Sequence, residues 1–144
     1  QTRSLALLQN AAFLPLFRQA MAGRGKVGNQ KIDELQPEVV AGPEALDEIF
    51  RDVSRDPAAA CRKVLGYLKG DRSPEELIAA ARRLVFLKGN DSHDYKFSSA
   101  VLEDYYHASP AWRDVFLATS VFRLNGAMEP DNRLVDRIRA ALTA

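Results

Sequence analysis

Apolar side chains recur at every third or fourth position along most of the chain after residue 43, with charged side chains between them. This spacing matches the 3.6-residue turn of an α-helix, so each run predicts a helix with one apolar stripe facing a core. The five stripes are Leu46/Ile49/Phe50/Val53, Cys61/Val64/Leu65/Leu68, Leu77/Ile78/Ala81/Leu84/Val85, Trp112/Val115/Phe116/Thr119 and Leu134/Val135/Ile138/Leu142.

Prolines mark where these helices are expected to begin. Five of the seven prolines precede an apolar run, and a proline at the first helical position loses no hydrogen bond. Ser73 also has Glu76 three residues further on, which is the capping-box pattern. Glycines that follow three of the runs are typical of left-handed helix ends. The prolines are Pro43, Pro57, Pro74, Pro110 and Pro130, and the glycines are Gly70, Gly89 and Gly126.

The chain therefore predicts an all-α fold, a compact bundle or array of six to eight short helices. No segment of useful length alternates apolar and polar residues as a half-buried strand does. Pro15 is expected to kink or restart the first helix, because proline cannot donate the helical hydrogen bond. The expected helices lie near residues 4–13, 15–22, 43–54, 57–69, 74–88, 96–107, 110–125 and 130–143.

We expect one domain over residues 1–144, with a long glycine-containing connection at residues 23–42, since 144 residues is an ordinary length for a single domain. The connection contains Gly23-Arg-Gly-Lys-Val-Gly28, which has the glycine spacing of a nucleotide-binding loop. That motif requires a strand before it and a helix after it, whereas here a helix is expected before it. A flexible loop with two cations is the favoured interpretation.

Charge and composition narrow the classes of partner. The chain has 20 Lys and Arg against 19 Asp and Glu, whereas nucleic-acid-binding proteins usually carry a basic excess. The longest apolar region, residues 5–17, is interrupted by Gln9, Asn10 and Pro15, so no membrane span is expected. The single cysteine, Cys61, excludes an internal disulfide. The cytoplasm is slightly favoured, and a periplasmic or secreted location after processing stays open.

Both histidines of the chain lie within residues 89–107, together with three of its four tyrosines. Glu103 and His107 are four residues apart, so they share one face of the expected helix. His93 lies in the loop before that helix, and folding of the loop could bring it close. A set of His93, Glu103 and His107 suits a divalent metal such as Zn²⁺ or Fe²⁺. This segment is therefore the candidate metal site.

The same segment could instead carry acid–base chemistry. His93 and His107 could transfer a proton while Asp94 orients an imidazole ring, which makes these three the candidate catalytic residues. In the ordinary interpretation the acids are turn and cap residues, and the tyrosines are core rings. The candidate binding residues around them are Asp91, Tyr95, Lys96 and Tyr106.

Two functions stay open at this point, and whether the chain is an enzyme is one of the questions between them. The first is a helical module that binds another protein or a second copy of itself, because grooves between short helices accept helical peptides. The second is a metal- or cofactor-binding enzyme domain that uses the segment from His93 to His107. Trp112 is expected in the core, although an exposed ring would be an anchor for a partner. Cys61 is expected to be a buried structural thiol.

Overall fold

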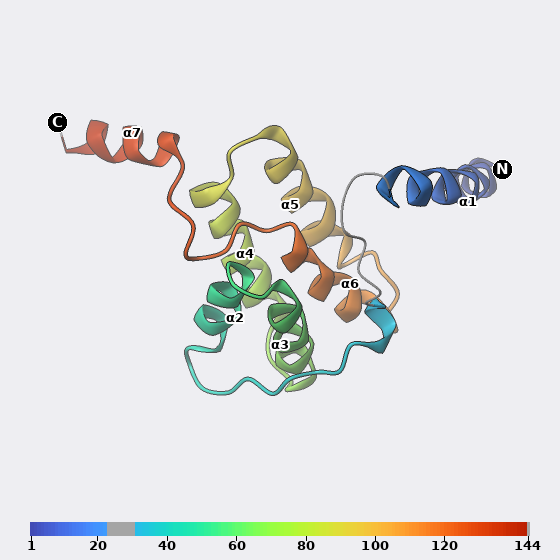
Figure 1. Cartoon of the computed structure of the whole chain (residues 1–144), viewed down its shortest axis with the longest axis horizontal. Coiled ribbons are helices and arrows are strands. Elements are labelled where there is room, and N and C mark those ends of the chain that lie inside the picture. The colour runs from blue at the N-terminus through green and yellow to red at the C-terminus, as the bar shows by residue number, and fades with distance from the viewer. Residues whose placement is uncertain (23–30, 144) are drawn as a thin grey trace. The chain divides into compact units, whose positions relative to one another are not determined.

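The computed structural model describes residues 1–22 and 31–143, and every regular element in that part of the chain is a helix (Figure 1). The all-α prediction is therefore confirmed. The chain divides into two compact units, residues 1–31 and 32–144, and the single domain stays a prediction. The elements are α1 (Thr2–Ala22), the short 3₁₀ helix η1 (Ile32–Glu34), α2 (Ala45–Val53), α3 (Pro57–Lys69), α4 (Pro74–Lys88), α5 (Ser92–Asp104), α6 (Arg113–Thr119), the 3₁₀ helix η2 (Ser120–Phe122) and α7 (Arg133–Leu142).

The helix α1 is continuous over 21 residues, with Pro15 inside it. The restart expected at Pro15 is therefore wrong, and the kink stays a prediction. Proline removes one backbone hydrogen bond from the helix. The leucines and alanines on both sides of Pro15 favour a helix strongly, so the helix continues without that bond. The glycine motif at residues 23–28 lies outside the described residues.

The core of residues 32–144 lies among α2, α3, α4 and α6. The stripes predicted on α2, α3 and α4 face this core, and their residues are buried or half-buried against it. Cys61 is completely buried, and burial raises the pKa of its thiol to about 11, so it is a structural thiol as expected. Leu102 of α5, Leu117 of α6 and Val121 of η2 complete the core.

Two predicted core stripes are not fully buried. On α6 the buried residues are Leu117 and Ala118, whereas Val115 of the predicted stripe packs half-buried against the core and Trp112 is exposed. On α7 Leu134, Ile138 and Leu142 are exposed. The placement of Trp112 and of the α7 stripe in the core is wrong, whereas Val115 lies at the edge of the core as a half-buried residue. A periodic pattern shows that a helix has an apolar face, but it does not show what covers that face.

Prolines mark only two of the five helix starts. Pro57 and Pro74 occupy the first turns of α3 and α4, and the side chains of Asp56 and Ser73 accept backbone hydrogen bonds there. The helices α2, α6 and α7 begin two or three residues after their prolines, because a turn or an extended segment comes first. Proline is favoured in such turns for the same fixed φ that suits a helix start.

The left-handed helix ends predicted at Gly70, Gly89 and Gly126 are also wrong. Gly70 has a φ of −85° and Gly89 a φ of −65°, and the residues described with positive φ are Gly42 and Asp71. The chain therefore turns left-handed one residue after Gly70. Aspartate tolerates this conformation better than most residues, because its short side chain can form local hydrogen bonds.

Candidate functional site

The predicted site segment forms α5 and the turns on either side of it. Asp91 caps α5, where its carboxylate accepts hydrogen bonds from the backbone amides of His93 at 2.7 Å and Asp94 at 3.1 Å. These two hydrogen bonds hold the pKa of Asp91 below its usual value. The exposed ring of His93 lies 3.6 Å from the same carboxylate. Asp91 is therefore a helix cap, as the ordinary interpretation had it.

The two histidines lie at opposite ends of α5. His93 is the second residue of this 13-residue helix, and His107 follows three residues after its end, so roughly 20 Å of helix separates them. Glu103 pairs with Arg82 at 3.6 Å. Among the described residues, no three His, Cys, Asp or Glu side chains are close enough together to hold a metal ion. The structure thus gives the Zn²⁺ or Fe²⁺ site no support.

Three of the candidate residues do meet at one hollow. His93, Asp94 and Lys96 line an open space of about 520 Å³ together with Phe97 and Arg123. The carboxylate of Asp94 accepts hydrogen bonds from the backbone amide of Asn90 at 2.8 Å and from Nδ2 of Asn125 at 3.4 Å. This carboxylate therefore joins the start of α5 to the loop after η2.

The other candidates have structural surroundings. The hydroxyl of Tyr95 donates to the carbonyl of Gly89 at 3.1 Å. Tyr106 is exposed, and its ring packs edge-on against the ring of the buried Tyr105, with the two ring centroids 5.4 Å apart. His107 lies in the turn after α5, where its backbone amide donates to Asp104. The catalytic roles of His93, Asp94 and His107 stay predictions.

A second hollow, of about 360 Å³, lies between η1 and α6. We call it the Trp112 hollow. Trp112 is 58% exposed as a residue, and Ile32 on the opposite side is 47% exposed. The residues from α6 are spaced i, i+3, i+4 and i+7, so they form one face of that helix. The lining residues are Ile32, Asp33, Trp112, Val115, Phe116 and Thr119.

Local sequence and packing explain why this apolar face is only half-buried and why Trp112 at its end is exposed. Leu117 and Ala118 occupy the other face of α6 and are completely buried, and α6 packs against α3. The turn at Ser109 places Trp112 just before the first helical residue, because the carbonyl of Ser109 accepts from the amides of Trp112 and Arg113. The hydroxyl of Thr119 donates to the carbonyl of Phe116, so its donor is satisfied within the helix. The hollow is thus mainly apolar, with Asp33 among its lining residues.

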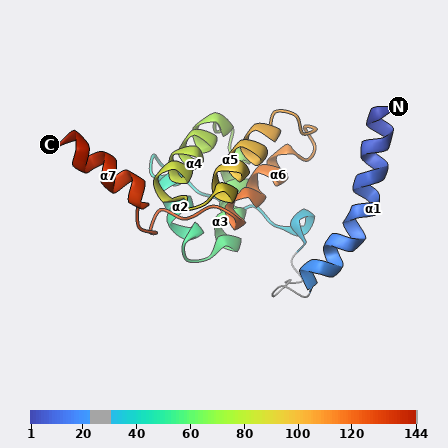
Figure 2. The same cartoon turned by 90° about the horizontal axis from the view of Figure 1, so that it is seen from above.

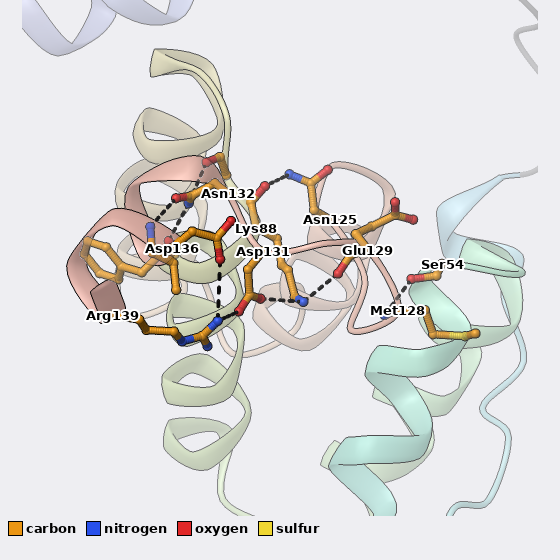
Figure 3. A network of polar contacts seen from close by, with 12 residues as sticks. Ser54, Lys88, Asn125, Met128, Glu129, Asp131, Asn132, Asp136 and Arg139 are labelled. Atoms are coloured by element: carbon orange, nitrogen blue, oxygen red, sulfur yellow. Dashed lines mark hydrogen bonds and ion pairs between the residues drawn. The ribbon is translucent and has the colours of Figure 1, made fainter. Parts of the chain in front are cut away.

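A polar network joins α7 to the end of α4 (Figure 3). The side-chain amide of Asn132 donates to the carbonyls of Phe86 at 2.8 Å and Gly89 at 2.9 Å, and its oxygen accepts from the amides of Leu134 and Val135. Asn132 is buried, and the sequence analysis missed it. The available signal was an asparagine directly before an apolar-periodic run, which is a preferred helix cap.

Asp131 is the charged centre of this network. Lys88 and Arg139 each approach its carboxylate to 2.7 Å, and both contacts hold the pKa of Asp131 below its usual value. The ammonium of Lys88 also donates to the carbonyl of Glu129. The network therefore fixes the segment that leads into α7 against α4.

No known protein family, curated protein or solved structure is significantly similar to this chain. Within the described residues, no helix is both long enough and apolar enough to cross a membrane. Function is therefore inferred from the surfaces of the chain itself.

Proposed function

We propose that residues 32–144 form a helical interaction module, which binds an amphipathic helix of a protein partner in the Trp112 hollow. The observation that supports this proposal is the exposed ring of Trp112 beside the apolar side chains of Ile32, Val115 and Phe116. Tryptophan is enriched among the residues that dominate the binding energy of protein interfaces. An apolar face at helical spacing is suited to packing against the apolar face of another helix.

The dimensions and charge of the hollow define the partner further. The stretch from Trp112 to Thr119 is about 10 Å long, which matches two turns of a partner helix and about three of its side chains. Asp33 among the lining residues favours a cation beside the apolar stripe of the partner. The expected ligand is therefore a short amphipathic helix with arginine or lysine beside its apolar face.

The test uses a synthetic amphipathic helical peptide that carries leucines at every fourth position and arginines beside them. Because Trp112 is the single tryptophan of the chain, its fluorescence reports binding at the hollow directly. We expect its emission to shift to shorter wavelength as the peptide is added. A peptide of the same composition in scrambled order should leave the emission unchanged.

Trp112→Ala should raise the Kd of the peptide, measured by calorimetry, about tenfold or more, as removal of an interface anchor does. Phe86→Ala is the matched control, since Phe86 is an exposed aromatic residue on α4. Equal binding by both variants, or no binding by the native chain, would contradict the proposed function.

A further inference from the structure

We infer that the helix bound in the Trp112 hollow is α7 of a second copy of this chain. The inference rests on the proposed function and names its partner. It begins from the second core-like stripe that the fold leaves uncovered. Leu134, Ile138 and Leu142 form this stripe on α7, and they are 56%, 50% and 81% exposed.

The helix α7 needs a cover for this stripe. It has ten residues, and isolated helices of that length are marginal in water. The described contacts that hold it to α4 are made by Asp131 and Asn132, at its N-terminal end. The apolar stripe runs along the rest of the helix and reaches its last residue, Leu142. Packing of an amphipathic face is what ordinarily stabilises such a helix.

The hollow of the same copy cannot supply that cover. Asn132 fixes the start of α7 to the carbonyls of Phe86 and Gly89, which lie at the C-terminal end of α4. The Trp112 hollow lies between η1 and α6. Both views show α7 leading away from α4 on the side remote from α6 (Figures 1 and 2). A second copy, however, can present its hollow to α7.

The two stripes are matched in length and charge. The stretch from Leu134 to Leu142 is about 12 Å long, close to the roughly 10 Å of the face that begins at Trp112. At 100° per residue, Arg137 and Arg139 lie on either side of the α7 stripe, and Arg139 is paired with Asp131 of its own copy. Asp33 lines the hollow, where it can meet Arg137. The helix α7 thus has the features expected of the ligand.

Two copies can make this contact twice, because each has one α7 and one hollow. A matched helix face of about 12 Å by 10 Å covers roughly 120 Å², so two reciprocal contacts, each burying a face on both copies, bury roughly 480 Å² in total. Stable interfaces bury about 1,200 Å² or more. We therefore expect a reversible dimer that forms as the protein concentration rises.

The experiment follows the full chain over a series of concentrations, with sedimentation equilibrium for mass and the emission of Trp112 for contact. We expect the dimer to appear together with a shift of the emission to shorter wavelength. Ile138→Glu should weaken the association about tenfold or more, because it places a charge in the middle of the stripe. Its helix content, measured by circular dichroism, should stay close to that of the native chain, since α7 contributes no buried residue.

Leu16→Glu is the matched control, because Leu16 is an exposed leucine of α1. This variant should associate as the native chain does. Loss of association in Leu16→Glu, with Ile138→Glu unaffected, would show that α1 covers the hollow and would overturn the inference.

A mixing experiment tests the pairing of α7 with the hollow. Ile138→Glu retains an intact hollow, and Trp112→Ala retains an intact α7. In their mixture Trp112 of the first variant is the single kind of tryptophan present, so its emission reports contact with α7 of the second. Addition of Trp112→Ala should shift this emission, whereas addition of the double variant Trp112→Ala/Ile138→Glu should not. An unchanged emission in the first mixture would overturn the inference.

Failure of the inference and failure of the proposed function can be told apart. A chain that stays monomeric at every concentration, yet binds the synthetic peptide at Trp112, overturns the second copy as partner and supports the hollow as a binding site. A chain that neither associates nor binds the peptide overturns both.

Discussion

Asn132 shows how much structure one side chain can determine. Its amide group donates to two carbonyls at the end of α4, and its oxygen accepts from two amides at the start of α7. Helix ends carry backbone groups without partners in the helix, and a single asparagine satisfies such groups at two ends at once. This explains why the side chain is buried although it is polar.

Asn132→Ala should destabilise the chain by about 2 kcal/mol, because it removes a helix cap and leaves carbonyls at the end of α4 without their donor. Urea denaturation measures this change. Asn90→Ala is the control, since Asn90 is exposed and its side chain donates one hydrogen bond, to Lys88. Equal losses of unfolding free energy in Asn132→Ala and Asn90→Ala would show that Asn132 does not join the two helices in solution.

Asp131 gives the same region a dependence on pH. Lys88 and Arg139 hold its pKa in the folded chain below the value of about 3.9 that is usual for an unfolded chain. Its contribution to stability is therefore present above about pH 4 and is lost as the pH falls through the lowered pKa. The difference in urea midpoint between the native chain and Asp131→Asn should narrow from pH 7 to pH 3.

Asp136→Asn is the control for this titration, because Asp136 is more exposed and lies 3.9 Å from Arg139. The difference in urea midpoint between Asp136→Asn and the native chain should stay small from pH 7 to pH 3. If the difference in urea midpoint for Asp131→Asn stayed constant with pH, the charge of Asp131 would not stabilise the folded chain, contrary to the prediction.

At the scale of elements, glycine allows a close contact that the sequence pattern did not predict. The segment at residues 35–40 crosses α3, and the backbone amide of Glu38 donates to the carbonyl of Arg62 at 3.0 Å. Gly66 of α3 lies directly beneath it, and a Cβ there would overlap the carbonyl of Glu38. The absence of a side chain at Gly66 therefore lets the segment pack against α3.

Gly66→Ala should destabilise the chain by about 1 to 3 kcal/mol, because overlap with backbone outweighs the better helix propensity of alanine. Gly70→Ala is the matched control at the end of the same helix, where a Cβ meets atoms at 3.4 Å and beyond. It should be neutral or slightly stabilising. Thermal unfolding of the two variants measures the difference, and an equal Tm would contradict the close packing.

Sequence alone predicted some elements far better than others. The bounds of α3 and α4 follow from Asp56 and Ser73, whose caps precede prolines, and their stripes face the core as expected. For α6 the pattern chose a face that is only half-buried, with Trp112 exposed at its end. Its residues include apolar side chains on both sides, and only packing of Leu117 against α3 decides which side is buried.

The candidate site was harder to predict, because it depends on where distant segments meet. Sequence spacing placed Glu103 and His107 on one helix face, but it could not show that α5 separates His93 from His107. Ile32 and Trp112 line one hollow although 80 positions separate them in the chain. What the sequence did provide was the alternative that an exposed Trp112 would be an anchor for a partner.

At the scale of the whole molecule, two helices described within residues 32–143 expose apolar residues from stripes with the spacing of core residues. One stripe lies on α6 at the Trp112 hollow, and the other lies on α7. Stripes of this kind ordinarily pack within a chain, and their exposure is the basis of the proposed binding of a partner helix at Trp112.

The most direct test is quenching of Trp112 fluorescence by acrylamide, at a dilution where sedimentation gives the mass of a single chain. The account predicts strong quenching, close to that of the same chain unfolded in urea, because the ring is largely exposed. Quenching should then weaken when the amphipathic peptide is added. A ring protected from acrylamide in the folded single chain would contradict the account, because Trp112 would then belong to the core.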